Sequence, residues 1–123
     1  MKKVIHKADT RGRSRYDWLD SHHTFSFYEY FDAERINFGA LRVLNDDRVA
    51  PGEGFQTHPH KNMEIVSIPL KGKLEHGDSK KNNRVITVGD IQVMSAGTGI
   101  FHSEMNGSKT EPVEFLQIWI MPR

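Results

Sequence analysis

Short segments in which apolar and polar residues alternate, separated by turn residues, recur along most of the 123-residue chain. Five of them read HTFSFYEYF, FGALRVLNDD, MEIVSIPLKGKLEH, RVITVGDIQVM and VEFLQIWIM. Successive side chains of a strand point to opposite faces, so each segment can bury one face. The breaks carry pairs such as Pro51-Gly52 and Gly89-Asp90, which favour tight turns. The pattern predicts an all-β fold, a sandwich or barrel of about eight or more strands.

The last segment, residues 113–121, is largely apolar on both faces. Such a strand needs cover on both sides, which predicts a position inside the sandwich. Helical periodicity is weak everywhere except around residues 28–36. No break resembles an interdomain linker, and we expect residues 1–123 to form one domain around one core.

Charge and composition exclude several functions. The 17 basic and 16 acidic residues nearly cancel, so overall charge directs the protein neither to nucleic acid nor to anionic membranes. The basic stretch RGRSRYDW, residues 11–18, is interpreted as a solvated loop. No segment approaches about 18 consecutive apolar residues, and there is no cysteine. We expect a soluble, cytoplasmic protein whose metal ligands, if any, are nitrogen and oxygen atoms.

Two histidine-containing motifs share the same spacing. In HPHKNME, residues 58–64, His58 and His60 project from one face of a strand, and Pro59 favours a strand edge. His102 and Glu104 repeat the spacing further along. If the two strands are neighbours, three imidazoles and a carboxylate meet, which predicts a metal site. A single HxH motif occurs by chance on many strands, but two, each after a glycine-rich approach, favour metal binding.

The remaining polar residues near these motifs give weaker signals. Four other histidines are interpreted as surface residues or as partners of the ligands: His6, His22, His23 and His76. Five polar neighbours of the motifs could orient the imidazoles or simply cap loops: Gln56, Thr57, Asn62, Ser103 and Asn106.

Taken together, several stretches resemble the pirin family of the cupin superfamily, nearly from end to end. They are SHHTFSFYEYFD, FGALRVLNDD, GFQTHPHKNMEIV, GKLEHGDS, GDIQVMSAGTGIFHSEMN and FLQIWIMPR. The first cupin motif reads Gly52, His58, His60, Glu64 and Gly72, and the second reads Gly89, Gly97, Gly99, His102 and Asn106. The Glu64–Gly72 spacing is one residue longer than is general in cupins, and Ser95 stands where proline is common.

The resemblance implies a single cupin-type β-barrel or jelly-roll sandwich over residues 1–123, without the second cupin domain that pirins usually have. In most cupins the glutamate of the first motif, here Glu64, binds the metal, whereas in pirins the carboxylate follows the second-motif histidine. We therefore predict His58, His60, His102 and Glu104 as ligands, with Glu64 as their partner or an alternate ligand. The ion implied is Fe(II), and Mn, Co, Ni, Cu or Zn fit the same donors.

Some pirins open flavonols such as quercetin with dioxygen, so the resemblance implies a dioxygenase in which Glu104 or Glu64 takes the substrate hydroxyl proton. The alternative is a non-catalytic metal-binding module that binds a transcriptional regulator. A third interpretation is metal-assisted sugar isomerisation or epimerisation. Because the second domain would normally cover part of the surface, self-association as a homodimer through that face is also expected.

Overall fold

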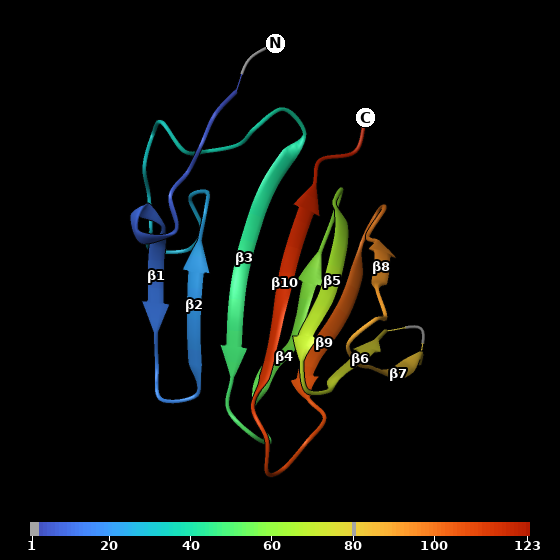
Figure 1. Cartoon of the computed structure of the whole chain (residues 1–123). Helices are drawn as coiled ribbons and strands as arrows, with labels where there is room; N and C mark the ends of the chain where they lie inside the picture. Colours follow the sequence, from blue (N-terminus) through green and yellow to red (C-terminus); the bar gives the residue numbers. More distant parts are fainter. Residues whose placement is uncertain (1–2, 80) are drawn as a thin grey trace.

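The computed structural model describes residues 3–79 and 81–123 and shows two antiparallel sheets packed face to face (Figure 1). The strands of the described residues are β1 (Gly12–Arg15), β2 (Leu19–His23), β3 (Leu41–Val49), β4 (Gly54–His60), β5 (Glu64–Lys71), β6 (Leu74–Asp78), β7 (Asn83–Ile86), β8 (Gln92–Ser95), β9 (Ile100–Asn106) and β10 (Val113–Ile120), preceded by a 3-10 turn at Ala8–Thr10. The predicted all-β fold is confirmed.

The larger sheet has the strand order β1-β2-β3-β10-β5-β8, and the smaller sheet has the order β4-β9-β6-β7. The last strand, β10, lies between β3 and β5 and buries Val113 and Phe115 completely, as its apolar faces predicted. At the opposite extreme, β4 has one neighbour and forms an edge of the smaller sheet, where the predicted edge residue Pro59 lies.

The apolar interior is divided into two clusters. One consists of Leu19, Val49, Leu74, Ile86, Val113 and Phe115, and the other of Ile65, Met94, Ala96 and Ile100. Along β10 the buried side chain that follows Phe115 is Gln117, and Trp119 beyond it packs against the second cluster. The side chains between the clusters are therefore polar in both sheets.

We call this layer the polar belt. Its buried members are Ser21, His23, Asn45, Asp47, Ser67, His76, His102, Glu104 and Gln117. In the larger sheet, four of them are partners on successive strands: His23 pairs with Asn45, Asn45 with Gln117, and Gln117 with Ser67. Buried polar groups are costly unless they are hydrogen-bonded or serve a ligand, so the polar belt is where we look for function.

The outer face of the larger sheet carries a row of alternating charges. Arg15 is the strand partner of Asp20, Asp20 of Arg48, and Arg48 of Glu114, whose other partner is Lys71. Opposite charges directly across a strand pair stabilise a sheet modestly. This row explains part of the basic stretch at residues 11–18, which forms β1 and the turn into β2 rather than the expected solvated loop.

Residues 28–36 do not form the helix that their periodicity indicated. Tyr28 has a φ of 50°, which is incompatible with a right-handed helix. The Ser26 hydroxyl accepts a hydrogen bond from the Asp32 N–H and so closes a loop in place of a helical turn. Among the described residues, no helix has the length and apolar character needed to cross a bilayer.

Candidate metal centre

The two histidine motifs lie on neighbouring strands. β4 pairs with β9 so that His58 is directly opposite His102, and His60 is opposite Ile100. The close approach of the two strands depends on Gly54, because a Cβ atom there would lie 2.5 Å from the Glu104 carbonyl oxygen. This pairing was the spatial condition on which the predicted site depended.

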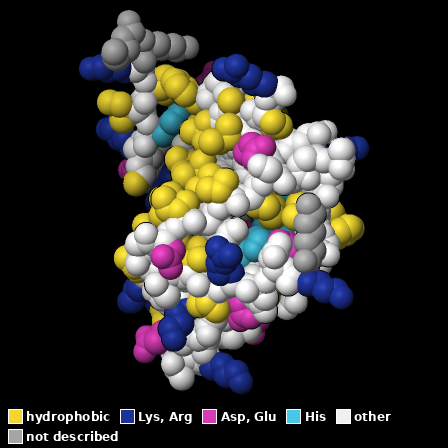
Figure 2. Space-filling model, turned by 90° about the vertical axis from the view of Figure 1, so that its right-hand side faces the viewer, with side chains coloured by type: hydrophobic (Ala, Val, Ile, Leu, Met, Phe, Trp, Pro, Cys, Tyr) yellow, Lys and Arg dark blue, Asp and Glu magenta, His cyan; other side chains and the backbone are white. Residues whose placement is uncertain are grey.

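The three imidazoles converge inside the sandwich. Ring centroids are 4.4 Å apart for His58 and His102, 4.6 Å for His60 and His102, and 4.8 Å for His58 and His60. One nitrogen from each ring can be chosen so that all three lie within 4.8 Å of one another. His102 is 1% exposed and the other two are half-buried. In the space-filling view, histidine side chains are seen only in part, between neighbouring atoms (Figure 2).

Hydrogen bonds to the other ring nitrogens orient two of these rings. The Nδ1 atom of His102 is 3.1 Å from Nε2 of His76, and Nδ1 of His58 is 2.7 Å from the Gln56 carbonyl oxygen. Within the described chain, the buried Nε2 atoms of His60 and His102 have no hydrogen-bond partner. His102 therefore combines a buried Nε2 atom that has no partner among the described residues with an anchored Nδ1 atom, which is the arrangement that metal-binding histidines show.

The imidazoles are also in the right protonation state. Burial, together with the neighbouring His58, lowers the pKa of His60 to about 4. Burial, followed by the repulsion of the neighbouring histidines, lowers the pKa of His102 to about 3. Both rings are therefore neutral at pH 7 and offer lone pairs to a cation. The donor set fits a divalent transition metal that accepts nitrogen and oxygen ligands.

Glu104 projects from β9 on the same face as His102 and is 1% exposed. Its Oε1 atom is 3.9 Å from His102 Nε2, and Oε2 accepts a 2.5 Å hydrogen bond from the Ser67 hydroxyl. Burial raises the pKa of Glu104 to about 7, although the bond from Ser67 opposes the shift. The carboxyl group therefore lies beside His102, although it is not part of the group of three histidines whose ligand atoms lie within 4.8 Å of one another.

The second candidate carboxylate, Glu64, begins β5 and is half-buried. Its Oε2 atom accepts a hydrogen bond from the Ser95 hydroxyl, the residue that replaces the usual proline of the second motif. Like Glu104, it is not part of the tight three-histidine group. Unlike Glu104, within residues 3–79 and 81–123 it makes no ion-pair contact with any of those histidines.

The structure separates the other predicted residues by role. Asn106 is buried, and its amide donates to the carbonyls of Val49, Ala50 and Glu111, so it fastens loops rather than imidazoles. Asn62 adopts a left-handed turn with a φ of 51°. His22 is half-buried, and His6 is half-buried with an edge contact to Phe25.

His23 and His76 are both buried in the polar belt, and only His76 contacts a predicted ligand. Sequence reasoning left His76 undecided and missed Ser67 altogether. Ser67 lies on β5, the strand that follows the first histidine motif, and His76 lies on β6, so the i, i+2 spacing within one strand could not have identified either.

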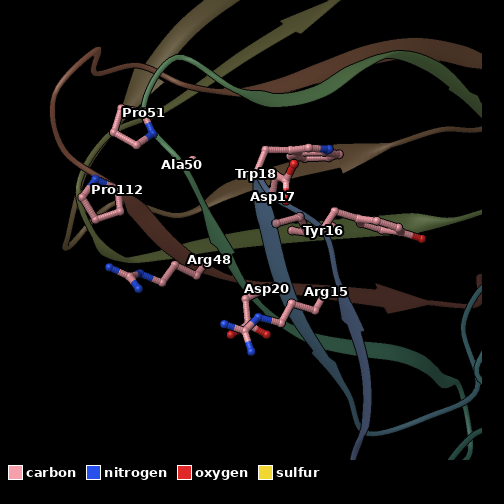
Figure 3. Close-up of a pocket in the computed structure, with 10 residues that line it drawn as sticks. Arg15, Tyr16, Asp17, Trp18, Asp20, Arg48, Ala50, Pro51 and Pro112 are labelled. Atoms are coloured by element: carbon pink, nitrogen blue, oxygen red, sulfur yellow. The ribbon is translucent and has the colours of Figure 1, made fainter.

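A hollow of about 480 Å³ on the outside of the molecule lies away from the histidines. Figure 3 shows Arg15 and Arg48 on its walls, with Tyr16 and Trp18 stacked side by side 6.4 Å apart and Pro51 and Pro112 at the other end. None of the four predicted metal ligands lines it. The convergence of buried nitrogens, rather than the size of a hollow, therefore identifies the candidate metal centre.

Solved structures similar to this chain define its class. The cupin domain of Schizosaccharomyces pombe Cnp3 superposes with a TM-score of 0.68 over 97% of this chain and 74% of that one, at 13% identity, which shows the fold alone. The structure of the bacterial pirin YhhW from Escherichia coli in complex with nickel(II) superposes with a TM-score of 0.92 at 53% identity, covering 95% of this chain and 51% of that one. The fold is that of a cupin.

The family is equally clear. The profile of the Pirin family matches residues 4–120, and the chain belongs to the pirin family. It is 53% identical over 118 residues to the quercetin 2,3-dioxygenase of Escherichia coli K12, covering 96% of this chain and 51% of that protein. It is 55% identical over 111 residues to a putative quercetin 2,3-dioxygenase of Zymomonas mobilis, and the match covers 90% of this chain and 47% of that protein. The chain thus spans about half the length of these relatives.

Proposed function

We propose that this chain carries the metal centre of a dioxygenase that opens flavonols such as quercetin, with His58, His60, His102 and Glu104 as ligands of a divalent ion, Fe(II) by family resemblance. The observation that carries the proposal is the convergence of three imidazoles, two of which are neutral at pH 7 and have buried nitrogens with no partner among the described residues. The names of the similar dioxygenases and the nickel complex of the similar pirin support it.

Three neutral imidazoles and one carboxylate around a divalent ion leave a net charge of about +1. Such a centre favours an anionic oxygen ligand, such as a deprotonated flavonol, and the ion supplies Lewis-acid and redox chemistry to it. The chain supplies the surroundings. His76 holds the His102 ring, Ser67 holds Glu104, and the two apolar clusters on either side of the polar belt limit the entry of water.

The proton of the substrate hydroxyl needs an acceptor near the ion. Glu104 is the better placed of the two glutamates, because its Oε1 atom lies 3.9 Å from His102 Nε2. Glu64 is already engaged by Ser95. In this proposal Glu104 would be one of the residues that hold the ion, and its carboxylate would also be the acceptor of the substrate hydroxyl proton.

The test begins with metal analysis of the purified protein, followed by oxygen consumption during incubation with quercetin after the metal has been restored. We expect the Glu104→Gln variant to lose most of its bound metal and its turnover. The Glu64→Gln variant is the matched control and should retain metal. Retained metal with lost turnover in Glu104→Gln would assign the residue as a base only. Full turnover in both variants, or no oxygen uptake by the loaded protein, would contradict the proposal.

A further inference from the structure

The hollow on the outside of the molecule, about 480 Å³ in volume, has a charged wall (Figure 3). This wall comes from the outer face of β1, β2 and β3, where Arg15 is the strand partner of Asp20, and Asp20 of Arg48. Strand partners lie on one face of a sheet, so the two arginines flank the aspartate with their Cα atoms about 10 Å apart. Both arginines are exposed, and such long side chains can reach one small ligand from opposite sides.

The nearest carboxylate does not neutralise these two arginines, because it is already engaged. Arg13 binds both oxygens of Asp20, with Nε 2.9 Å from Oδ1 and Nη2 2.9 Å from Oδ2. This hydrogen-bonded pair is the main reason that the pKa of Asp20 is lowered. Within the part of the chain that the structure describes, neither Arg15 nor Arg48 forms an ion pair. Two guanidinium groups are therefore left to bind an anion.

Much of the remaining lining of the hollow is apolar and rigid. Tyr16 and Trp18 stack with an angle of 15° between their ring planes, and Trp18 also packs edge-on against Phe55 with centroids 5.5 Å apart. Trp18 and Phe55 both pack against the first core cluster, which holds the indole ring in place. Pro51 and Pro112 line the other end of the hollow (Figure 3). Rigid aromatic and proline rings offer a surface for a planar apolar body at little cost in conformational entropy.

The balance of charge indicates how much negative charge a ligand should carry. Asp17, the sequence neighbour of Trp18, brings a second carboxylate to the lining. Counting Arg13 with the two arginines of the wall, three arginines face two aspartates, which leaves one positive charge in excess. A carboxylate carries one negative charge, whereas a phosphate monoester carries about −1.5 to −2 at pH 7. The hollow therefore suits a carboxylate better than a phosphate ester.

We propose that this hollow binds a small aromatic carboxylate. The ring would lie against Trp18 and the proline rings, while the carboxylate would accept hydrogen bonds from the guanidinium groups of Arg15 and Arg48. The planar fork of arginine matches a carboxylate, and charge-assisted hydrogen bonds are stronger than neutral ones. The volume lies within the range of about 300–1,000 Å³ that small-molecule sites occupy. No ion takes part, so the inference goes beyond the proposed function and can succeed or fail independently of it.

The test titrates benzoate into the full chain after bound metal has been removed, so that the metal centre cannot take the carboxylate. Amide NMR shifts report both the affinity and the place of binding. Two probes divide the contributions, because benzyl alcohol keeps the ring without the charge and acetate keeps the charge without the ring. We expect benzoate to bind at least about fivefold more tightly than benzyl alcohol and about threefold more tightly than acetate. Benzoate binding no tighter than benzyl alcohol, or shifts only outside the hollow, would overturn the proposal.

Substitutions at exposed positions, which the fold tolerates, locate the site. Arg15→Gln and Arg48→Gln should each weaken benzoate binding by at least about fivefold and leave the affinity for benzyl alcohol unchanged. Lys71→Gln is the matched control, because it removes the same charge at the end of the same row but does not line the hollow. It should change the affinity for benzoate by less than about twofold. Equal losses in the lysine and arginine variants, or no loss in either arginine variant, would contradict the assignment.

The remaining variant reverses the sign of the expected effect. Asp17→Asn removes a carboxylate that repels an anion in the hollow, so it should strengthen benzoate binding by about twofold and leave the affinity for benzyl alcohol as it is. A general loss of folding cannot produce tighter binding, which separates this result from damage to the structure. Weaker benzoate binding in Asp17→Asn would count against an anion site.

Discussion

The two ends of the polar belt bury polar groups for different partners. In the three-histidine group, the Nε2 atoms of His60 and His102 have no partner in the described part of the chain, which suits a cation. The group around Asp47 is instead bonded mostly within itself, because the Asp47 carboxyl accepts hydrogen bonds from Ser21 and Gln117, and among the described residues only the buried Asn45 amide nitrogen is left without a partner there. The comparison teaches that burial alone does not define a site. The type of atom left unpaired decides which ligand a buried polar cluster can accept.

The two ends also differ in how burial shifts their ionisation. Burial lowers the pKa of His60 and His102 and raises the pKa of Asp47 to about 6, and in each case it opposes the charged form. As pH falls, the histidines resist taking up protons that the unfolded chain would bind. Asp47 instead takes up a proton earlier than the unfolded chain does. His60 and His102 therefore affect acid stability in the opposite direction to Asp47, and Glu104, whose pKa burial also raises, acts in the same direction as Asp47.

The largest effect that would test the difference between the two ends is the loss of metal affinity on removal of a central ligand. We expect His102→Ala to lower the affinity for nickel(II) or zinc(II) more than about 100-fold, because removing an orienting partner alone typically costs 10–100-fold. Competition with a chromophoric chelator measures the affinity. Asp47→Asn is the control from the other end of the polar belt and should bind metal as the wild type does. Equal losses in the two variants would show that the two ends are not functionally distinct.

A smaller effect is expected at the hydrogen bond that orients His102. His76→Phe removes the acceptor for His102 Nδ1 and should weaken metal binding by about 10–100-fold. His76→Gln can still offer an acceptor and should lose less. The parallel change His23→Phe, in the other buried histidine, should leave metal affinity unchanged. An effect of His23→Phe as large as that of His76→Phe would count against an orienting role.

The pH dependence of stability tests the raised pKa of Asp47 at the other end of the polar belt. The folded protein protonates this carboxyl below about pH 6, whereas the unfolded chain does so near the ordinary value of 3.8. Between these values the folded state holds an extra proton, so this group adds stability as pH falls. Asp47→Asn lacks that gain. From pH 7 to 4.5 its free energy of unfolding should fall by about 2 kcal/mol relative to wild type, by denaturant titration of the metal-free proteins. If the free energy of unfolding changed equally with pH in the wild type and in Asp47→Asn, the raised pKa of Asp47 would be contradicted.

The smallest effect belongs to the charge row outside the sandwich. Arg48 lies between Asp20 and Glu114 on exposed strand surface. Pairs of this kind contribute little in water, so Arg48→Gln should change the free energy of unfolding by less than about 1 kcal/mol and leave metal binding intact. Thermal unfolding and metal competition measure both. A loss as large as that expected for the buried variants would show that the row supports the polar belt.

The parts of the site that follow from spacing could be predicted from sequence. The two i, i+2 pairs fixed which side chains share a face, and Pro59 indicated an edge strand, which β4 is. The pairing of His58 with His102 could only be assumed from sequence, because the whole sheet sets the register between strands that are distant in the chain. Ser67 and Gln117 could not be recognised, since each is an ordinary inward position until its neighbours across the sheet are known.

Other expectations remain predictions. They include the organisation of residues 1–123 as a single domain, the cytoplasmic location, a homodimer, and a regulator protein as partner. Apolar side chains are exposed on and between β7 and β8, among them Val85, Val88, Ile91 and Val93. This side of the molecule faces the viewer in Figure 2, where apolar side chains gather. Light scattering at several concentrations would test the predicted self-association.

The marginal position of β4 has a consequence for local dynamics. This strand is joined to the sheet through β9 alone, and the ladder is interrupted between Phe55 and His58. Edge strands with few ladder bonds open easily. Because His58 and His60 come from β4 and His102 from β9, shared coordination would act as a cross-link between the two strands. Amide hydrogens of β4 should then exchange with solvent deuterium much more slowly once the ion is bound.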